Sequence, residues 1–275
     1  MIYVNYKAVA QSVFPGGEVK VTVPSYDPLT KELTVVAMLH NSDDVMALVM
    51  TTNALRHQYA FKPTMHLELL YFPYARQDRV CNPGEAHGVQ AMAAIVNSLG
   101  YASVKVWDPH SDAVQAAVNN CLVASQVSVL QNYLGVRAIQ KYTLVSPDAG
   151  AEKKVNALAK AVSSWGLAPN VVYASKVRNL ANGQILATNY IGEVRGVDCL
   201  IVDDICDGGR TFTELAKKLK EGGAKSVTLY VTHGIFSAGL DPLREHIDHV
   251  YCYHSFIDTA DSFLTVFRKQ GALNA

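Results

Sequence analysis

The chain contains 275 residues, of which 49% are hydrophobic and 17% charged, and its formal net charge is zero. The balanced charge argues against a nucleic acid or an anionic membrane as a binding partner. The length allows one large domain, but two compact domains are the more common arrangement. The apolar content of the chain suits a large core.

Strand-like runs alternate with helical periodicity along most of the chain, which is typical of α/β proteins with mainly parallel sheets. Six strands are predicted, at residues 67–72, 103–107, 142–145, 170–174, 199–202 and 226–231. A helix is predicted over 86–99, where Gly100 ends it. Another helix follows the third strand and presents Val155, Leu158 and Val162 on one face. Both halves of the chain therefore use the same strand–loop–helix plan.

The most informative segment begins with the apolar run 199–202, which predicts a buried strand. This strand brings two adjacent carboxylates, Asp203 and Asp204, to its C-terminal end. A Gly-Gly turn follows, and then Thr211 and Glu214 have the spacing of a capping box at a helix N-terminus. Apolar residues continue at helical spacing as far as the next glycine pair, where we expect the helix to end.

A strand, an acidic pair, a glycine turn and a helix N-terminus together suit a sugar phosphate. Free N–H groups and the helix dipole favour a phosphate, while carboxylates can bind sugar hydroxyls or a hydrated Mg²⁺. An alternative is that Asp204 or Asp207 only satisfies turn amides, as acidic loop residues often do. The residues alone leave both interpretations open.

Other polar segments also follow predicted strands, where open α/β sheets bind ligands. Arg76 and Arg79 leave the first strand, and their guanidinium groups suit a polyphosphate or a salt-bridged surface turn. His110 follows the next strand, although a lone histidine is more often structural than a ligand. Asp148 follows the third strand and could be an ordinary helix cap.

Five segments, 72–78, 108–111, 146–150, 203–211 and 232–237, occur in the order found in the 5-phosphoribosyl-1-diphosphate (PRPP) synthetases, or ribose-phosphate pyrophosphokinases. The run 203–211 resembles the PRPP signature that these enzymes share with type I phosphoribosyltransferases. The first two segments have no counterpart in the simple transferases. The chain therefore resembles a PRPP synthetase from about residue 14 to residue 236.

The resemblance implies two tandem type I phosphoribosyltransferase-like domains, each a mainly parallel sheet flanked by helices. We place them at residues 1–138 and 139–275, divided in the polar stretch 135–141. The implied reaction is Mg²⁺-dependent transfer of the β,γ-diphosphate of ATP to the C1 hydroxyl of ribose 5-phosphate, which gives PRPP and AMP. The resemblance also implies a homo-oligomer whose ATP site is shared between subunits.

The family's functional residues correspond to positions in both halves of the chain. The positions that match ATP-binding residues are Phe14, Glu18, Arg76 and Gln77. The positions that match magnesium ligands are His110 and Asp148, and the diphosphate loop matches Asp148, Ala149 and Gly150. The matching catalytic pair, on a mobile loop, is Lys176 and Arg178. The positions that match ribose-phosphate-binding residues are Asp203, Asp204, Asp207, Gly208, Gly209, Arg210 and Thr211.

Three positions depart from the family pattern. Gly16 stands where the family usually has Asn or Asp, the loop 80–85 is several residues shorter, and Arg210 replaces a small residue. A divergent enzyme acting on a larger ribose 5-phosphate derivative such as ADP-ribose is therefore an alternative, as is a non-catalytic synthetase-associated regulatory protein. Retention of the catalytic and metal-binding positions argues against the regulatory protein.

Five cysteines are spread through the chain and none forms a Cys-x-x-Cys pair. This pattern predicts free thiols, no disulfide framework and no zinc site. The N-terminal residues lack the basic and apolar regions of a signal peptide, and no apolar run is long enough to span a membrane. We therefore expect a cytoplasmic protein.

Overall fold

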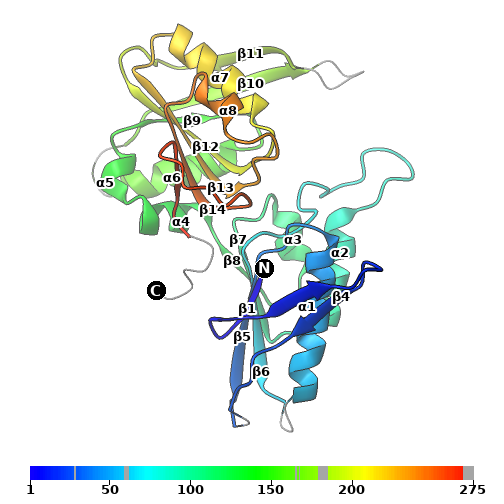
Figure 1. The fold of residues 1–275 in the computed structure, drawn as a ribbon. Coiled ribbons are helices and arrows are strands. Elements are labelled where there is room, and N and C mark those ends of the chain that lie inside the picture. The colour runs from blue at the N-terminus through cyan, green and yellow to red at the C-terminus, as the bar shows by residue number, and fades with distance from the viewer. Residues whose placement is uncertain (28, 59–61, 165, 167, 179–184, 269–275) are drawn as a thin grey trace. The chain divides into compact units, whose positions relative to one another are not determined.

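The computed structural model describes residues 1–27, 29–58, 62–164, 166, 168–178 and 185–268 (Figure 1). The chain divides into two compact units, one formed by Met1–Ser125 and one that begins at Gln126. This division places the helices α4 (Gln126–Tyr133) and α5 (Val136–Ile139) in the second unit. A domain division at 138/139 would place α4 and all but the last residue of α5 in the first domain, and that division stays a prediction.

The first unit contains a six-stranded sheet with the order β2-β1-β5-β6-β7-β8. Its strands are β1 (Ile2–Val4), β2 (Lys7–Ala8), β5 (Glu32–Ala37), β6 (Thr64–Leu69), β7 (Ser103–Trp107) and β8 (Cys121–Ala124). The strands from β5 to β8 are parallel, and β1 is antiparallel to both of its neighbours. A separate hairpin consists of β3 (Ala10–Val13) and β4 (Val19–Thr22). The helices are α1 (Ser42–Gln58), α2 (Gly88–Ser98) and α3 (Asp112–Ala117).

Sequence periodicity explains the core of this unit. Alternate residues of β6 are buried, as expected for a strand with one face on the core. On α2 the buried residues Val89, Met92, Ala93 and Val96 recur at helical spacing. Gly100 follows the last turn of α2 with a φ of +58°, so the predicted glycine stop is confirmed.

The second unit contains a seven-stranded sheet with the order β11-β10-β9-β12-β13-β14-β15. Its strands are β9 (Thr143–Ser146), β10 (Val171–Arg178), β11 (Ile185–Ile191), β12 (Asp198–Cys206), β13 (Ser226–Gly234), β14 (His249–Ser255) and β15 (Leu264–Val266). All neighbouring strands are parallel except β10 and β11. The remaining helices are α6 (Glu152–Ser163), α7 (Arg210–Glu221) and α8 (Asp241–Arg244).

The strand β12 occupies the middle of this sheet, so both of its faces are covered. Cys199 and Ile201 on one face belong to the same buried cluster as Leu215 and Leu219 of α7. The predicted helix at this position is therefore confirmed, and it ends at Gly222. The amphipathic spacing of α7 holds the helix against the sheet and fixes where its N-terminus lies.

All six predicted strands are present, and the α/β class with mainly parallel sheets flanked by helices is confirmed. Sequence periodicity did not reveal α1, β5, β11 or β14. The five cysteines carry free thiols, as predicted. Within the described residues, no helix combines the length and apolar character that a membrane-spanning segment needs.

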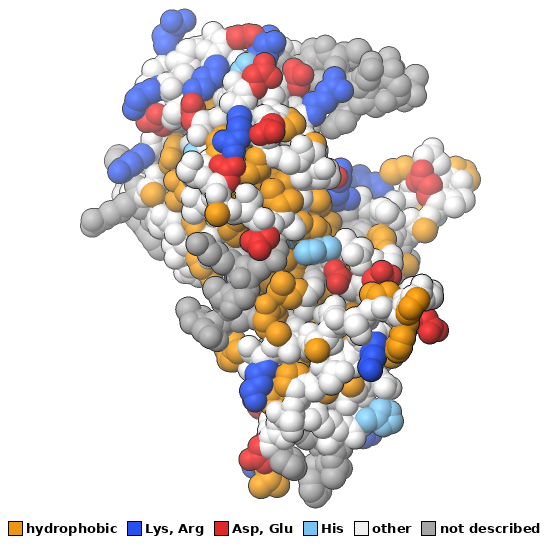
Figure 2. Space-filling view, viewed as in Figure 1, with side chains coloured by type: hydrophobic (Ala, Val, Ile, Leu, Met, Phe, Trp, Pro, Cys, Tyr) orange, Lys and Arg blue, Asp and Glu red, His pale blue; other side chains and the backbone are white. Residues whose placement is uncertain are grey.

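Charges of both signs are interspersed over the face drawn in Figure 2. In the second unit several of them form ion pairs, such as Lys218 with Glu221 at 2.7 Å and Lys220 with Asp248 at 2.6 Å. A nucleic-acid-binding surface is instead a broad patch of positive charge. On the face drawn, the charges of the described residues do not form a patch of that kind.

Candidate active site

The acidic pair lies inside β12 and not beyond its end. Asp203 is paired in register with Val231 of β13, and the ladder continues to Cys206. The prediction that the strand stops at residue 202 was therefore wrong. The strand is longer because the neighbouring parallel strand β13 offers hydrogen-bond partners as far as Gly234, although the local sequence turns acidic.

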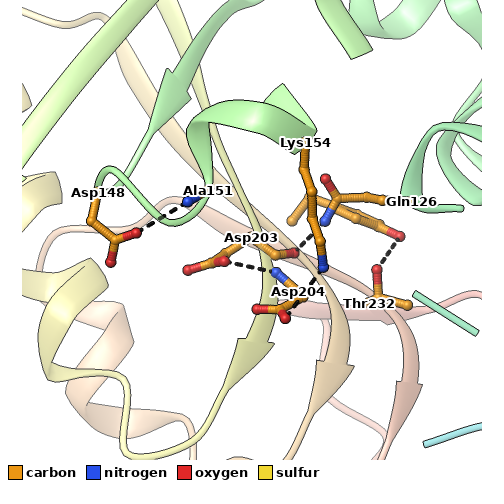
Figure 3. A network of polar contacts seen from close by, with 8 residues as sticks. Gln126, Asp148, Ala151, Lys154, Asp203, Asp204 and Thr232 are labelled. Carbon is orange, nitrogen blue, oxygen red and sulfur yellow. Dashed lines mark hydrogen bonds and ion pairs between the residues drawn. The ribbon is translucent and has the colours of Figure 1, made fainter. Parts of the chain in front are cut away.

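Adjacent residues of a strand point to opposite faces of the sheet, so the two carboxylates have different surroundings (Figure 3). Asp204 is buried and its Oδ2 lies 3.3 Å from Nζ of Lys154 on α6. Asp203 is partly buried, and its Oδ1 accepts a hydrogen bond from the backbone N–H of Asp204 at 2.8 Å. Of the two carboxylates, Asp204 is thus the one paired with Lys154.

The pKa of Asp203 is raised well above its usual value. Burial is the main cause, followed by the negative charge of Asp204, with a smaller contribution from Asp148. A carboxyl group in such surroundings is stabilised by hydroxyl donors or by a cation. The site therefore favours a ligand that brings hydroxyl groups or a metal ion to the end of β12.

The segment 146–150 connects β9 to α6 at the same edge of the sheet. Ser146 Oγ donates a hydrogen bond to the backbone oxygen of Asp148 at 3.0 Å. Asp148 Oδ1 accepts one from the backbone N–H of Ala151 at 3.2 Å, immediately before α6 begins (Figure 3). The helix-cap interpretation therefore accounts for one carboxylate oxygen of Asp148.

The segment 207–211 connects β12 to α7, and it does not contain the predicted capping box. The residue at the N-cap is Gly209, with a φ of +78°, which has no side chain to cap the helix. A Cβ at Gly209 would lie 2.7 Å from a Leu243 methyl group, so both conformation and space require glycine. The helix starts two residues earlier than the capping box predicts, at Arg210, which is exposed.

The N-cap residue Gly209 thus offers no side chain to the first N–H groups of α7. One carboxylate oxygen of Asp207, Oδ1, accepts a hydrogen bond from Ser237 Oγ at 2.5 Å. Uncapped N–H groups and the helix dipole favour an anion. The loop 207–211 is therefore suited to a phosphate, beside the acidic pair on the same strand.

In the first unit, three predicted ATP-site or metal-site residues follow neighbouring parallel strands. Arg76 and Gln77 come after β6, His110 comes after β7, and all three are exposed. A Cβ at Gly88 would lie 2.5 Å from Oε1 of Gln77, so glycine at the start of α2 leaves room for that side chain. The structure thus brings Arg76, Gln77 and His110 to one edge of the sheet.

Arg79 of the same segment supports the salt-bridge alternative. Its Nε lies 3.1 Å from Oδ1 of Asp78, and its side chain is 76% exposed. An exposed pair between neighbouring residues contributes little to stability. Arg79 is therefore explained as a surface charge.

Phe14 and Glu18 lie in the turn of the β3–β4 hairpin. Their backbones are joined by a hydrogen bond from Phe14 N to Glu18 O at 2.9 Å. The Phe14 ring is 52% exposed, whereas Val19 and Val21 of β4 pack on the core of the first unit. The hairpin is thus anchored at its base and presents an aromatic ring at its tip. Gly16 has open space around its Cβ position, so packing does not require glycine there.

Lys176 and Arg178 do not lie in a loop as predicted. They belong to β10, which is antiparallel to β11, and Lys176 is opposite Thr188. The ladder becomes irregular between Val177 and Arg178. The predicted mobile segment continues into residues 179–184, which lie outside the described residues.

Among the described residues, no group of three or more histidine, cysteine, aspartate or glutamate side chains forms a metal site. His110 and Asp148 belong to different units, and their role as magnesium ligands stays a prediction. Sequence reasoning missed Lys154 and also Gln126, whose Nε2 donates a hydrogen bond to the backbone oxygen of Asp203 at 2.8 Å. A lysine in the first turn of the helix that follows the segment 146–150 was the available signal.

The chain is similar to known proteins of one family. Residues 131–268 match the family model "Phosphoribosyl transferase domain", which covers half of the chain. A ribose-phosphate pyrophosphokinase of Vibrio vulnificus is 32% identical over 245 residues, which cover 86% of this chain and 74% of that protein. This chain belongs to the ribose-phosphate pyrophosphokinase family.

For two other members of the family, the match covers a smaller share of the relative's own length. The enzyme of Ureaplasma parvum is 31% identical over 71% of this chain, and that of Rhizobium meliloti is 33% identical over 72%. The chain spans 58% and 62% of the length of these two relatives. A phosphoribosylpyrophosphate synthetase from Mycobacterium smegmatis has the same fold, with a TM-score of 0.77 at 22% identity over 94% of this chain and 85% of that chain.

Proposed function

We propose that this protein transfers the β,γ-diphosphate of ATP to the C1 hydroxyl of ribose 5-phosphate and releases PRPP and AMP. One observation carries the proposal: the carboxylates of Asp203 and Asp204 and the N-terminus of α7, with glycine at its N-cap, follow one another on β12 and its loop. In a member of the pyrophosphokinase family, this arrangement suits both ends of a ribose 5-phosphate. The carboxylates would accept hydroxyl groups of the ribose, and the amides of 207–211 would bind its 5-phosphate.

The residues that we propose to bind ATP lie in the first unit. Arg76 and His110 follow neighbouring strands, and a guanidinium group is well suited to a polyphosphate. Phe14 and Glu18 would complete the adenine site of a neighbouring subunit, which accounts for an exposed aromatic ring at a hairpin tip. The active form would then be a homo-oligomer.

Magnesium is the cofactor that we propose. The hard carboxylate oxygens of Asp148 and the acidic pair suit Mg²⁺. Burial and the negative charges of Asp204 and Asp148 raise the pKa of Asp203, and a bound cation would offset those charges. His110 and Asp148 would hold the ion that accompanies ATP. When bound, it supplies positive charge that neutralises the phosphate oxygens.

The chemistry requires positioning and charge, and it needs no protein nucleophile. The C1 hydroxyl oxygen bonds to the β-phosphorus of ATP, the bond from that phosphorus to the α–β bridging oxygen breaks, and AMP leaves. Negative charge spreads over the phosphoryl oxygens in the transition state. Lys176 and Arg178, which match the catalytic pair of the family, would stabilise that charge.

A second acceptor, ADP-ribose, is favoured by one feature of the loop 207–211. Arg210 is exposed at the start of α7, and a Cβ at Gly208 would meet no atom within 4 Å. The loop is thus open where the 5-phosphate would carry a further group, and a guanidinium can bind a diphosphate.

Phosphorus NMR with MgATP and either acceptor tests the proposal. We expect AMP and a C1 diphosphate to form only when the acceptor is present, and we expect the reaction to stop when EDTA removes Mg²⁺. Release of ADP or free phosphate would contradict the proposed reaction. Absence of turnover with both acceptors would instead favour the regulatory protein.

A further inference from the structure

Lys154 occupies a position on α6 that helix energetics disfavour. The helix begins at Glu152, so Lys154 lies in its first turn. Positive side chains in the first turn oppose the helix dipole, which is stabilised there by anions. An interaction outside the helix must therefore explain this lysine.

That interaction is with Asp204. The Nζ atom of Lys154 lies 3.3 Å from Oδ2 of Asp204, and the two side chains are only 23% and 6% exposed. An ion pair with so little access to water is costly to desolvate, so it contributes less to stability than its contact distance suggests. Such a pair is better explained by what it orients than by how strongly it stabilises the fold.

The pair joins two parts of the site in the second unit. Asp204 belongs to the acidic pair of β12, and Lys154 belongs to the helix that begins directly after the segment 146–150 (Figure 3). The backbone N–H of Asp204 also donates to Asp203 Oδ1. One hydrogen-bonded chain thus connects α6, Asp204 and Asp203.

We propose that Lys154 is a positioning residue for the sugar acceptor. Its ammonium group holds Oδ2 of Asp204 and thereby orients the carboxylate that accepts a hydroxyl group of the ribose. This inference rests on the proposed function. It predicts that Lys154 affects the affinity for the sugar acceptor and not the affinity for ATP.

The test measures steady-state kinetics of Lys154→Met with each substrate varied in turn. We expect the Michaelis constant for ribose 5-phosphate to rise ~10-fold or more, as when one partner of a buried charge pair is removed. The Michaelis constant for ATP should change by less than about 2-fold. Lys154→Arg should restore most of the acceptor affinity, because a guanidinium can also pair with Asp204. Lys160→Met, an exposed position on the same helix, is the matched control and should behave as wild type.

A double-mutant cycle separates positioning from a general structural role. In an Asp204→Asn background, Lys154→Met should raise the acceptor Michaelis constant little further, because the pair is already broken. A loss of thermal stability with both Michaelis constants affected equally would overturn the inference, as would equal effects in both backgrounds. If Lys154→Met does not fold, Lys154→Gln supplies the same comparison.

These outcomes are distinct from failure of the proposed function. A wild-type protein that turns over neither ribose 5-phosphate nor ADP-ribose would contradict the proposed function and, with it, the role of Lys154. An active wild type together with an unchanged acceptor Michaelis constant in Lys154→Met would contradict the role of Lys154 alone.

Discussion

The backbone N–H of Asp204 donates a hydrogen bond to Oδ1 of Asp203, with 2.8 Å between the two atoms. The two carboxylates have different electrostatic surroundings. Asp204 forms an ion pair with Lys154, whereas burial raises the pKa of Asp203. In the ligand-free protein, the ionised form of Asp203 is therefore destabilising. This difference between the two carboxylates gives a prediction about stability.

We expect Asp203→Asn to increase the melting temperature of the ligand-free protein at neutral pH, although it should abolish acceptor binding. The folded pKa is raised, so the contribution of Asp203 to wild-type stability is highest below the usual aspartate pKa and falls as pH rises through the folded value. The variant should lack this decline. Thermal unfolding of both proteins from acidic to neutral pH measures the difference, and a lower melting temperature of the variant at pH 7 would refute it.

Asp198 provides a control of opposite sign. Hydrogen bonds from Ser226 and Lys225 lower the pKa of Asp198. Its contribution to stability is therefore present above the usual aspartate pKa and is lost as pH falls through the folded value. Asp198→Asn should lower the melting temperature at pH 7 and converge with wild type in acid.

The catalytic pair gives a second prediction. Lys176→Ala and Arg178→Ala should each lower the turnover number by ~10²–10³ while leaving substrate affinity much less affected, because their charges act in the transition state. Arg195→Ala, at an exposed position of the same unit, is the control and should keep wild-type turnover. Steady-state kinetics at saturating substrate concentrations measures the turnover number. An unchanged turnover number would exclude the catalytic role that the family assigns to this pair.

Arg210 gives a prediction about the acceptor. We expect wild type to have a higher kcat/KM for ribose 5-phosphate than for ADP-ribose, because the other ribose-side residues match ordinary synthetases. Turnover of ADP-ribose should fall about 10-fold or more in Arg210→Gly, as when a hydrogen bond to a charged group is lost. A wild-type preference for ADP-ribose would reverse this order of acceptors.

The hairpin tip gives a prediction about assembly. Light scattering should detect at least a dimer, and Phe14→Ala should raise the Michaelis constant for ATP because stacking on adenine is lost. If neighbouring subunits share the site, mixing Phe14→Ala,Glu18→Ala with Lys176→Ala should restore activity that neither has alone. A fully active monomer, or a mixture without recovery, would contradict a shared site.

Regular periodicity made much of the second unit predictable. The strand at 226–231 and the apolar face of α7 follow from local spacing of apolar residues, and both are present in the structure. The prediction failed where tertiary contacts override local preference. At Gly209, contact with Leu243 and a left-handed backbone set the helix start, so the Thr211 capping box does not form.

The sequence by itself determined the α/β class, the family and the presence of the acidic pair, because apolar spacing and motif order are local properties of the chain. Only the tertiary structure decided that Asp203 and Asp204 lie within a strand, that Lys176 and Arg178 lie on β10, and that Lys154 pairs with Asp204. The last contact joins residues 50 positions apart. Such a contact depends on how α6 packs beside β12, which no local pattern of residues records.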